Sequence, residues 1–250
     1  EKKYLNFDGL NLTYETLDGI IKHNGPYKSK INIPNLIQSL KTDFDFEIDK
    51  YSSLEGQIAN ICDDIAYVSH DLEDGLRSKI IKMKDLINLP IIDIFLQKFK
   101  KNKINDDKLL IYYLTNNLSN YFINDLVENS KFNIIKNEIK TIDDVINYGK
   151  QIIEMKTNTY KELISIKKFL FENMYNNEEI LDQYSLIDKK FRFLFEMYTN
   201  NPKNLPVKWQ TSDYKLRKNV RDAIIATDVC DYIASMTDNY FEMKSNDLRS

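Results

Sequence analysis

Glycine and proline are scarce in this chain, and their scarcity limits the folds that are open to it. Six glycines and five prolines occur among 250 residues, and five of the glycines lie within the first 75 positions. Alternating apolar runs that meet at Asn-Gly or Asp-Gly turns, which indicate β-hairpins, are nearly absent. Leucine, isoleucine, lysine and glutamate recur instead at spacings of three and four, the period of an α-helix. The sequence therefore predicts an all-α fold, a bundle of several helices.

Caps and breakers divide this pattern into separate helices. The first is expected over residues 14–23, where an Asn-Gly-Pro sequence ends it. Ser52 and Glu55 have the spacing of a capping box, which predicts that the next helix begins there, and its apolar face runs as far as Leu72. Further helices are expected at about 78–88, 91–101, 107–128, 142–175, 182–200 and 213–245.

Composition indicates the cellular compartment of the chain and argues against some classes of partner. The net charge is −3 with acids and bases interspersed, so a dedicated nucleic-acid surface is not expected. Cys62 and Cys230 each fall inside an apolar helical pattern, which predicts two buried, reduced thiols. No apolar run reaches membrane-spanning length and no signal-peptide pattern opens the chain. A cytoplasmic protein with no membrane partner is expected.

The stretch DDIAYVSHD at residues 63–71 places an aromatic ring between two carboxylates on one helix face. At about 100° per residue, Asp63, Tyr67 and Asp71 lie opposite the apolar stripe of their helix. Spacing alone favours an exposed acidic face with an incidental tyrosine. The alternative is a face that lines a polar cavity, where carboxylates bind a metal or a sugar hydroxyl and the ring packs on a ligand.

Five segments of the chain share a pattern with known proteins, namely residues 10–26, 53–77, 166–175, 204–209 and 229–241. Together they resemble the bacterial deoxyguanosine triphosphate triphosphohydrolase-like family, within the HD phosphohydrolase superfamily. They follow one another in the order of the family, and SLEGQIANICDDIAYVSHDLEDGLR is the most specific of them. The resemblance covers the C-terminal two-thirds of the family's length and implies an HD-type helical bundle without its N-terminal His and His-Asp helices. Residues 1–90 would complete the catalytic core, and 91–250 would form a helical phosphohydrolase-associated region.

The resemblance also implies roles for particular residues. Asp63 stands where the family has the last ligand of a single metal ion. Tyr67 resembles the tyrosine beside the nucleotide sugar, and Asp71 resembles the acid that contacts a sugar hydroxyl. Lys167 resembles a phosphate-contacting cation, and Tyr175 resembles a second tyrosine that faces the nucleotide.

The implied reaction is attack of metal-activated water on the α-phosphate of a deoxynucleoside triphosphate, above all deoxyguanosine triphosphate. A divalent metal (Mg, Mn or Fe) suits this reaction because it lowers the pKa of bound water and neutralises phosphate charge. Its His and His-Asp ligands are expected upstream of residue 1, so the chain alone is not expected to be active. The family further implies a homo-oligomer.

Two departures from the family pattern keep other functions open. The chain has two histidines, His23 and His70, and neither stands in the family's ligand context. His23 is expected to be structural or cavity-lining, and His70 to support the site or face solvent. Asn176 and Asn177 replace a basic pair, which removes positive charge near the phosphates. One alternative is a non-catalytic relative that binds nucleotides or mediates oligomerisation. Another is a phosphohydrolase that acts on a different phosphoester.

Overall fold

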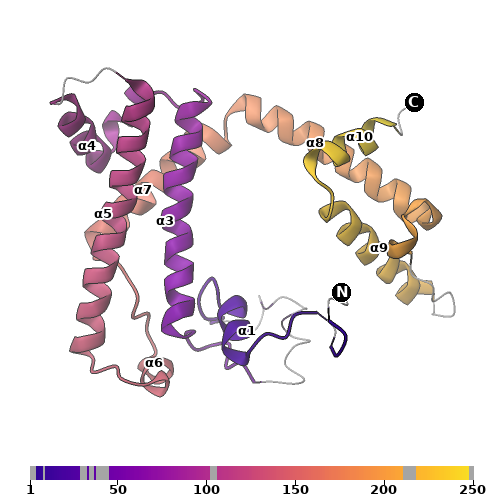
Figure 1. Ribbon diagram of the computed structural model, residues 1–250, viewed down its shortest axis with the longest axis horizontal. Coiled ribbons are helices and arrows are strands. Elements are labelled where there is room, and N and C mark those ends of the chain that lie inside the picture. The colour runs from indigo at the N-terminus through magenta and orange to yellow at the C-terminus, as the bar shows by residue number, and fades with distance from the viewer. Residues whose placement is uncertain are drawn as a thin grey trace. The chain divides into compact units, whose positions relative to one another are not determined.

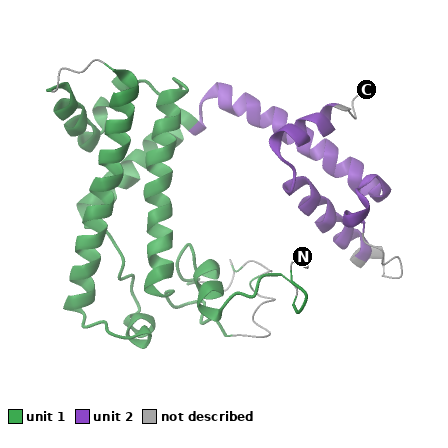
Figure 2. Ribbon diagram, in the orientation of Figure 1, with its two compact units in different colours: residues 1–174 green, residues 175–250 purple. Residues whose placement is uncertain are grey.

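The computed structural model describes helices separated by short loops. Within the ranges that it describes, every regular element is helical and no strand occurs, so the prediction of an all-α fold is confirmed. Internal contacts divide the chain into two compact units, residues 1–174 and 175–250 (Figure 2). The described residues are 4–7, 9–28, 33, 37, 45–101, 106–210 and 218–247.

The first unit is built around two long helices. A π-helical turn, Phe171–Tyr175, follows its last helix. The helices described in this unit are α1 (Tyr14–Ile21), α3 (Leu54–Arg77), a 3-10 helix (Met83–Asn88), α4 (Pro90–Lys100), α5 (Asp107–Lys136), α6 (Ile142–Tyr148) and α7 (Thr157–Leu170).

The core of the first unit lies where α3, α5 and α7 meet. α3 and α5 run antiparallel side by side, and α7 crosses them (Figure 1). Val68 and Leu72 of α3, Leu118 of α5, and Leu163 and Ile166 of α7 are fully buried. Each such side chain contributes about 1.5–3 kcal/mol relative to an exposed one. This packing determines which part of α3 lies beside α7.

A polar contact joins α7 to α5 beside the same core. The Tyr121 hydroxyl of α5 donates to a carboxylate oxygen of Glu162 on α7 over 2.7 Å. Burial, together with this hydrogen bond, raises the pKa of Tyr121 above that of a free phenol. The phenol therefore keeps its proton and remains a donor.

The helix expected over 142–175 is interrupted in the structure, so that prediction is wrong. α6 ends at Gly149, whose φ of 72° is left-handed, and α7 begins only at Thr157. Between them, backbone groups of residues 151–156 form hydrogen bonds with side chains of other helices. Those partners lie far away in sequence, and local helical periodicity gives no sign of them.

Gln57 of α3 is the main partner of the 151–156 segment. Its side-chain oxygen accepts the backbone N–H groups of Ile152 (2.9 Å) and Ile153 (3.2 Å). Its amide nitrogen donates to the carbonyl of Ser52 (3.0 Å). Gln57 is buried, with 4% of its surface exposed. One buried amide therefore joins the start of α3 to the chain that leads into α7.

Side chains of α5 bind the other side of the 151–156 segment. Asn133 donates to the carbonyl of Ile152 (3.0 Å), and Asn129 donates to the carbonyl of Glu154 (2.9 Å). The carboxylate of Asp125 accepts the backbone N–H of Lys156 (2.8 Å). Because residues 125, 129 and 133 are spaced four apart, they form one polar stripe on α5. Most of the segment's backbone is thus hydrogen-bonded without being helical.

Three other expectations need smaller corrections. The N-cap of α3 is Ser53, whose hydroxyl accepts from the Gly56 N–H, so the capping box of Ser52 and Glu55 is not formed. Cys62 and Cys230 are free, as expected, but exposed rather than buried. Only the second half of the helix expected over 78–88 forms, as the short 3-10 helix, while α5 extends past its expected end to Lys136.

The second unit has its own small core. Leu194 and Tyr198 of α8 pack against Val229 and Tyr232 of α9, and Trp209 lies 5.9 Å from the ring of Tyr232. The elements described there are α8 (Glu178–Asn200), two 3-10 turns (Pro202–Asn204 and Val207–Trp209), α9 (Lys218–Ala234) and α10 (Asp238–Asp247).

The helix expected over 213–245 is also divided. Residues 211–217 lie outside the described residues, and α9 and α10 are separated by a turn at 235–237. The predicted boundary at residue 90 separates two regions of the family, a catalytic core and an associated region. The division into compact units does not test it, so it stays a prediction. In the described part of the chain, no helix combines the length and the apolar character needed to cross a membrane.

We expect Gln57→Leu to lower the free energy of unfolding by about 2–4 kcal/mol, because it leaves the buried N–H groups of Ile152 and Ile153 without an acceptor. Chemical denaturation measures this loss. Asn124→Leu, which also replaces an amide side chain with leucine but at an exposed position of α5, is the control and should change stability by less than about 0.5 kcal/mol. Equal effects of the two variants would contradict the role given to Gln57.

Candidate functional site

The polar face of α3 is partly open and partly covered. The Asp63 carboxylate is 74% exposed, whereas Tyr67 is 37% exposed and Asp71 is half-buried. The three residues do share one side of α3, as their spacing predicts. Asp63 therefore fits the exposed acidic face, while the other two lie closer to neighbouring elements.

Lys167 of α7 reaches this face. Its ammonium nitrogen lies 5.6 Å from the centroid of the Tyr67 ring, within the range of a cation–π contact. The same nitrogen lies 2.5 Å from a carboxylate oxygen of Asp64. The structure thus brings together Tyr67 and Lys167, two residues that the resemblance assigned to one nucleotide site.

Asp64 is the residue at this site that sequence reasoning missed. It precedes Tyr67 by three positions, so both side chains project toward α7. Its partner is 103 positions away in the chain, and the run of acids from 63 to 74 gives no reason to select it. The pairing depends on the crossing of α3 and α7, which only the three-dimensional packing reveals.

His23 approaches the same face from α1. Its ring nitrogen Nε2 lies 3.6 Å from a carboxylate oxygen of Asp63. His23 also lines a cavity of about 900 Å³ between α1, the start of α3 and α6, as expected of a cavity-lining residue. Both side chains are well exposed, 41% for His23 and 74% for Asp63, so this contact contributes little stability.

A close approach of two glycines places α1 against α3. A Cβ atom on Gly56 would lie 3.4 Å from the Cα of Gly19 and 2.6 Å from the hydroxyl of buried Ser52. The absence of a side chain at Gly56 therefore lets the two backbones meet. This contact determines how near His23 comes to Asp63.

The described residues do not complete a metal site. Among them, no group of three or more His, Cys, Asp or Glu side chains is arranged to hold a metal ion. Asp63 and His23 offer two donors at most, and a catalytic site usually has at least three protein ligands. The role of Asp63 as a metal ligand stays a prediction.

Tyr175 and the two asparagines after it lie at the start of the second unit. Tyr175 is half-buried and ends the π-helical turn. The Asn177 side chain accepts the backbone N–H of Glu179 (3.0 Å) and caps α8, which is a common role for asparagine. Asn177 therefore has a structural reason to be there, and Asn176 is exposed.

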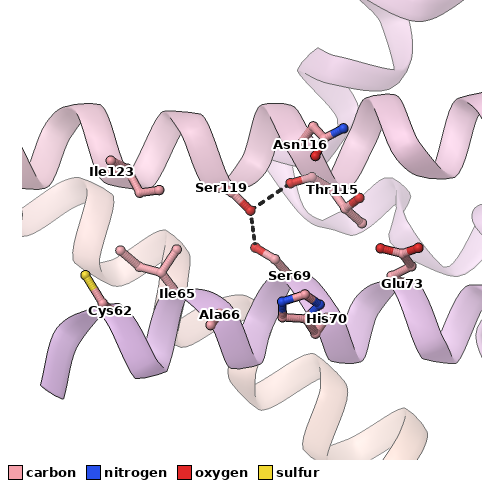
Figure 3. A pocket seen from close by; sticks show the side chains of 10 residues that line it. All are labelled: Cys62, Ile65, Ala66, Ser69, His70, Glu73, Thr115, Asn116, Ser119 and Ile123. Atoms are coloured by element: carbon pink, nitrogen blue, oxygen red, sulfur yellow. Dashed lines mark hydrogen bonds between the residues drawn. The ribbon is translucent and has the colours of Figure 1, made fainter. Parts of the chain in front are cut away.

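His70 lies on another face of α3 from Asp71. It lines a pocket of about 220 Å³ between α3 and α5, together with Cys62 and Glu73 (Figure 3). At the base of the pocket, the hydroxyls of Ser69 and Ser119 form a hydrogen bond of 2.7 Å. His70 is exposed, as expected of a residue that faces solvent.

Comparison with known proteins identifies relatives along the whole chain. Residues 153–246 match the phosphohydrolase-associated domain. A deoxyguanosinetriphosphate triphosphohydrolase-like protein of Rickettsia bellii is 38% identical over 252 aligned positions, which cover 100% of this chain and 64% of that protein. The chain is a relative of the deoxyguanosinetriphosphate triphosphohydrolase-like proteins. The resemblance predicted from the sequence is therefore confirmed.

Other relatives of the same name give the same alignment. The protein of Rickettsia canadensis is 37% identical over 99% of this chain and 65% of its own length. That of Neorickettsia sennetsu is 36% identical over 96% of this chain and 61% of its own length. The chain thus spans less than two thirds of the curated relatives that it matches, and it corresponds to their C-terminal part.

We expect Gly56→Ala to lower the free energy of unfolding by about 1–3 kcal/mol, the usual effect of overpacking. It should also speed amide hydrogen exchange in α1. Gly19→Ala is the control, because its Cβ atom would meet only the Cα of Gly56 at 3.8 Å. In a helix, alanine is favoured over glycine by up to about 1 kcal/mol, so Gly19→Ala should be neutral or stabilising. A stabilising Gly56→Ala would show that the glycine contact does not hold α1.

Proposed function

We propose that this chain supplies the nucleotide-binding helices of a deoxynucleoside triphosphate triphosphohydrolase. The reaction separates a deoxynucleoside from inorganic triphosphate by cleavage at the α-phosphate. Deoxyguanosine triphosphate is the proposed substrate, in keeping with the names of the relatives. The chain is similar to proteins named as triphosphohydrolase-like, and triphosphohydrolase activity of this protein is what we propose.

The observation that carries this proposal is the position of the Lys167 ammonium beside the Tyr67 ring. A nucleotide needs an apolar surface for its sugar or base and a cation for its phosphates. Tyr67 offers the first and Lys167 the second, within a few ångströms of each other. Asp71, one helical turn beyond Tyr67, is proposed to accept a hydrogen bond from a sugar hydroxyl.

A divalent metal (Mg, Mn or Fe) is part of the proposal, with Asp63 as one ligand. An exposed carboxylate oxygen suits any of these ions. The metal would supply Lewis acidity at the phosphate. Because the described residues do not complete its ligand set, the other ligands would come from outside them.

The remaining parts of the proposal concern assembly and surroundings. Tyr175 is proposed as a second nucleotide-facing tyrosine. Residues 1–90 are proposed to belong to the catalytic core and 91–250 to the associated region, and the protein is proposed to form a homo-oligomer in the cytoplasm.

A second candidate function is nucleotide binding without turnover. One observation favours it: Asn177 serves as the cap of α8 rather than as a phosphate-binding cation. Under this proposal the Tyr67 and Lys167 pair would still bind a deoxynucleotide. The two functions therefore differ in turnover and not in binding.

We expect Lys167→Met, in the complete polypeptide that contains this chain, to raise KM for the deoxynucleotide. The loss of a hydrogen bond to a charged phosphate predicts a rise of about 10- to 100-fold. The matched control is Lys168→Met, because Lys168 is 74% exposed and pairs with Glu172 over 3.7 Å. Chromatography of deoxynucleoside and triphosphate measures the reaction.

Asp63→Asn in the same polypeptide should abolish triphosphate release and leave deoxynucleotide binding within about threefold, because a lost metal ligand affects chemistry more than sugar and base contacts. If the metal-loaded polypeptide binds deoxynucleotides but releases triphosphate from none of them, the second function is correct. Equal effects of the Lys167 and Lys168 variants would contradict the placement of the phosphates.

A further inference from the structure

The Lys167 ammonium already has an anionic partner in the structure. Asp64 contacts it at 2.5 Å, and the two side chains are about one third exposed, 31% for Asp64 and 33% for Lys167. Asp64 lies three positions before Tyr67, so the carboxylate and the ring hold the ammonium from neighbouring positions on one face of α3. The cation proposed to bind phosphate is therefore paired before any phosphate arrives.

The charges around Lys167 do not favour an anion. Asp63, Asp64 and Asp71 place three carboxylates along two turns of α3, and the ammonium of Lys167 lies against this face. An ammonium has three N–H donors, so it has room for a phosphate oxygen beside a carboxylate. A carboxylate and a phosphate at one ammonium nevertheless repel each other.

We infer that Asp64 competes with polyphosphate for Lys167, and that the ammonium exchanges the carboxylate for phosphate oxygens when a triphosphate binds. This inference rests on the proposed function, since it assigns Lys167 to the phosphates. Asp64 acts through Lys167 and is a positioning residue. It holds the ammonium over Tyr67 in the unliganded chain and weakens the binding of anions there.

The exchange has a consequence for anion binding. Breaking the Asp64–Lys167 pair costs the same whichever anion takes the ammonium, whereas repulsion by the displaced carboxylate grows with the charge of the anion. Asp64 would thus disfavour triphosphate at Lys167 at least as much as orthophosphate. The alternative is that the Asp64–Lys167 pair only fastens α7 to α3, in which case loss of Asp64 loosens the site and weakens the binding of every anion.

Titration of the chain with inorganic tripolyphosphate at low ionic strength, followed by calorimetry, separates these possibilities. Exposed ion pairs have coupling energies that correspond to about two- to fivefold in affinity, so Asp64→Asn should tighten tripolyphosphate binding by about that factor. Asp74→Asn, which makes the same change of charge ten positions further along α3, is the control and should change the affinity less than Asp64→Asn does. Tripolyphosphate binding should gain at least as much from Asp64→Asn as orthophosphate binding gains, because Asp64 repels the more highly charged anion more strongly.

The decisive test measures the effect of Asp64→Asn in a protein that also carries Lys167→Met. In a double-mutant cycle, the effect of Asp64→Asn should disappear when Lys167 is already methionine, because no ammonium is then left for Asp64 and phosphate to compete for. Side-chain amine NMR signals of Lys167 should move in Asp64→Asn and on addition of tripolyphosphate. A gain that persists in Lys167→Met would reflect net charge alone and overturn the inference. Weaker binding in Asp64→Asn, or no binding by either form, would overturn it as well.

Kinetics of the complete polypeptide distinguish failure of this inference from failure of the proposed function. With turnover, Asp64→Asn should lower KM by about two- to fivefold while kcat stays within about twofold. Turnover with an unchanged KM would refute the exchange and leave the function standing. Tighter tripolyphosphate binding without turnover of any deoxynucleotide would support the exchange and refute the function.

Discussion

The buried amide of Gln57 is the interaction on which the arrangement of the first unit depends. It satisfies two backbone donors of the 151–156 segment and one carbonyl before α3. Because an unpaired buried N–H costs about 1–3 kcal/mol, this segment cannot leave Gln57 without a large penalty. The segment leads directly into α7, so Gln57 and the apolar core together determine where α7 crosses α3. The site beside Tyr67 is a product of that crossing.

Two contacts of different kinds then deliver side chains to the polar face of α3. α7 arrives through apolar packing and carries Lys167, whereas α1 arrives through the close contact of Gly19 and Gly56 and carries His23. Each neighbour brings a nitrogen to a carboxylate, Lys167 to Asp64 and His23 to Asp63. Adjacent acids on one helix thereby contact different neighbouring elements.

The sequence was sufficient for features that depend on local pattern. The apolar stripe of α3, the polar face of Asp63, Tyr67 and Asp71, and the all-α fold all follow from helical periodicity and scarce breakers. It was insufficient where a distant partner decides the outcome. The sequence of residues 151–156 fits a helical pattern. Only the hydrogen bonds to Gln57 and to the polar stripe of α5 explain why the segment is not helical. Likewise, Asp64 differs from the acids around it only because α7 passes next to it.

The hydroxyl pair of Ser69 and Ser119 also sets the register between α3 and α5. Ser69 is buried, and its 2.7 Å hydrogen bond to Ser119 joins the two helices directly. If α5 slid along α3 by one helical turn, about 5.4 Å, leucine and isoleucine side chains would still find apolar neighbours. The hydrogen bond between the two hydroxyls, however, would be broken inside the interface. Apolar packing tolerates several alignments of two long helices, and this small polar contact distinguishes one of them from the rest.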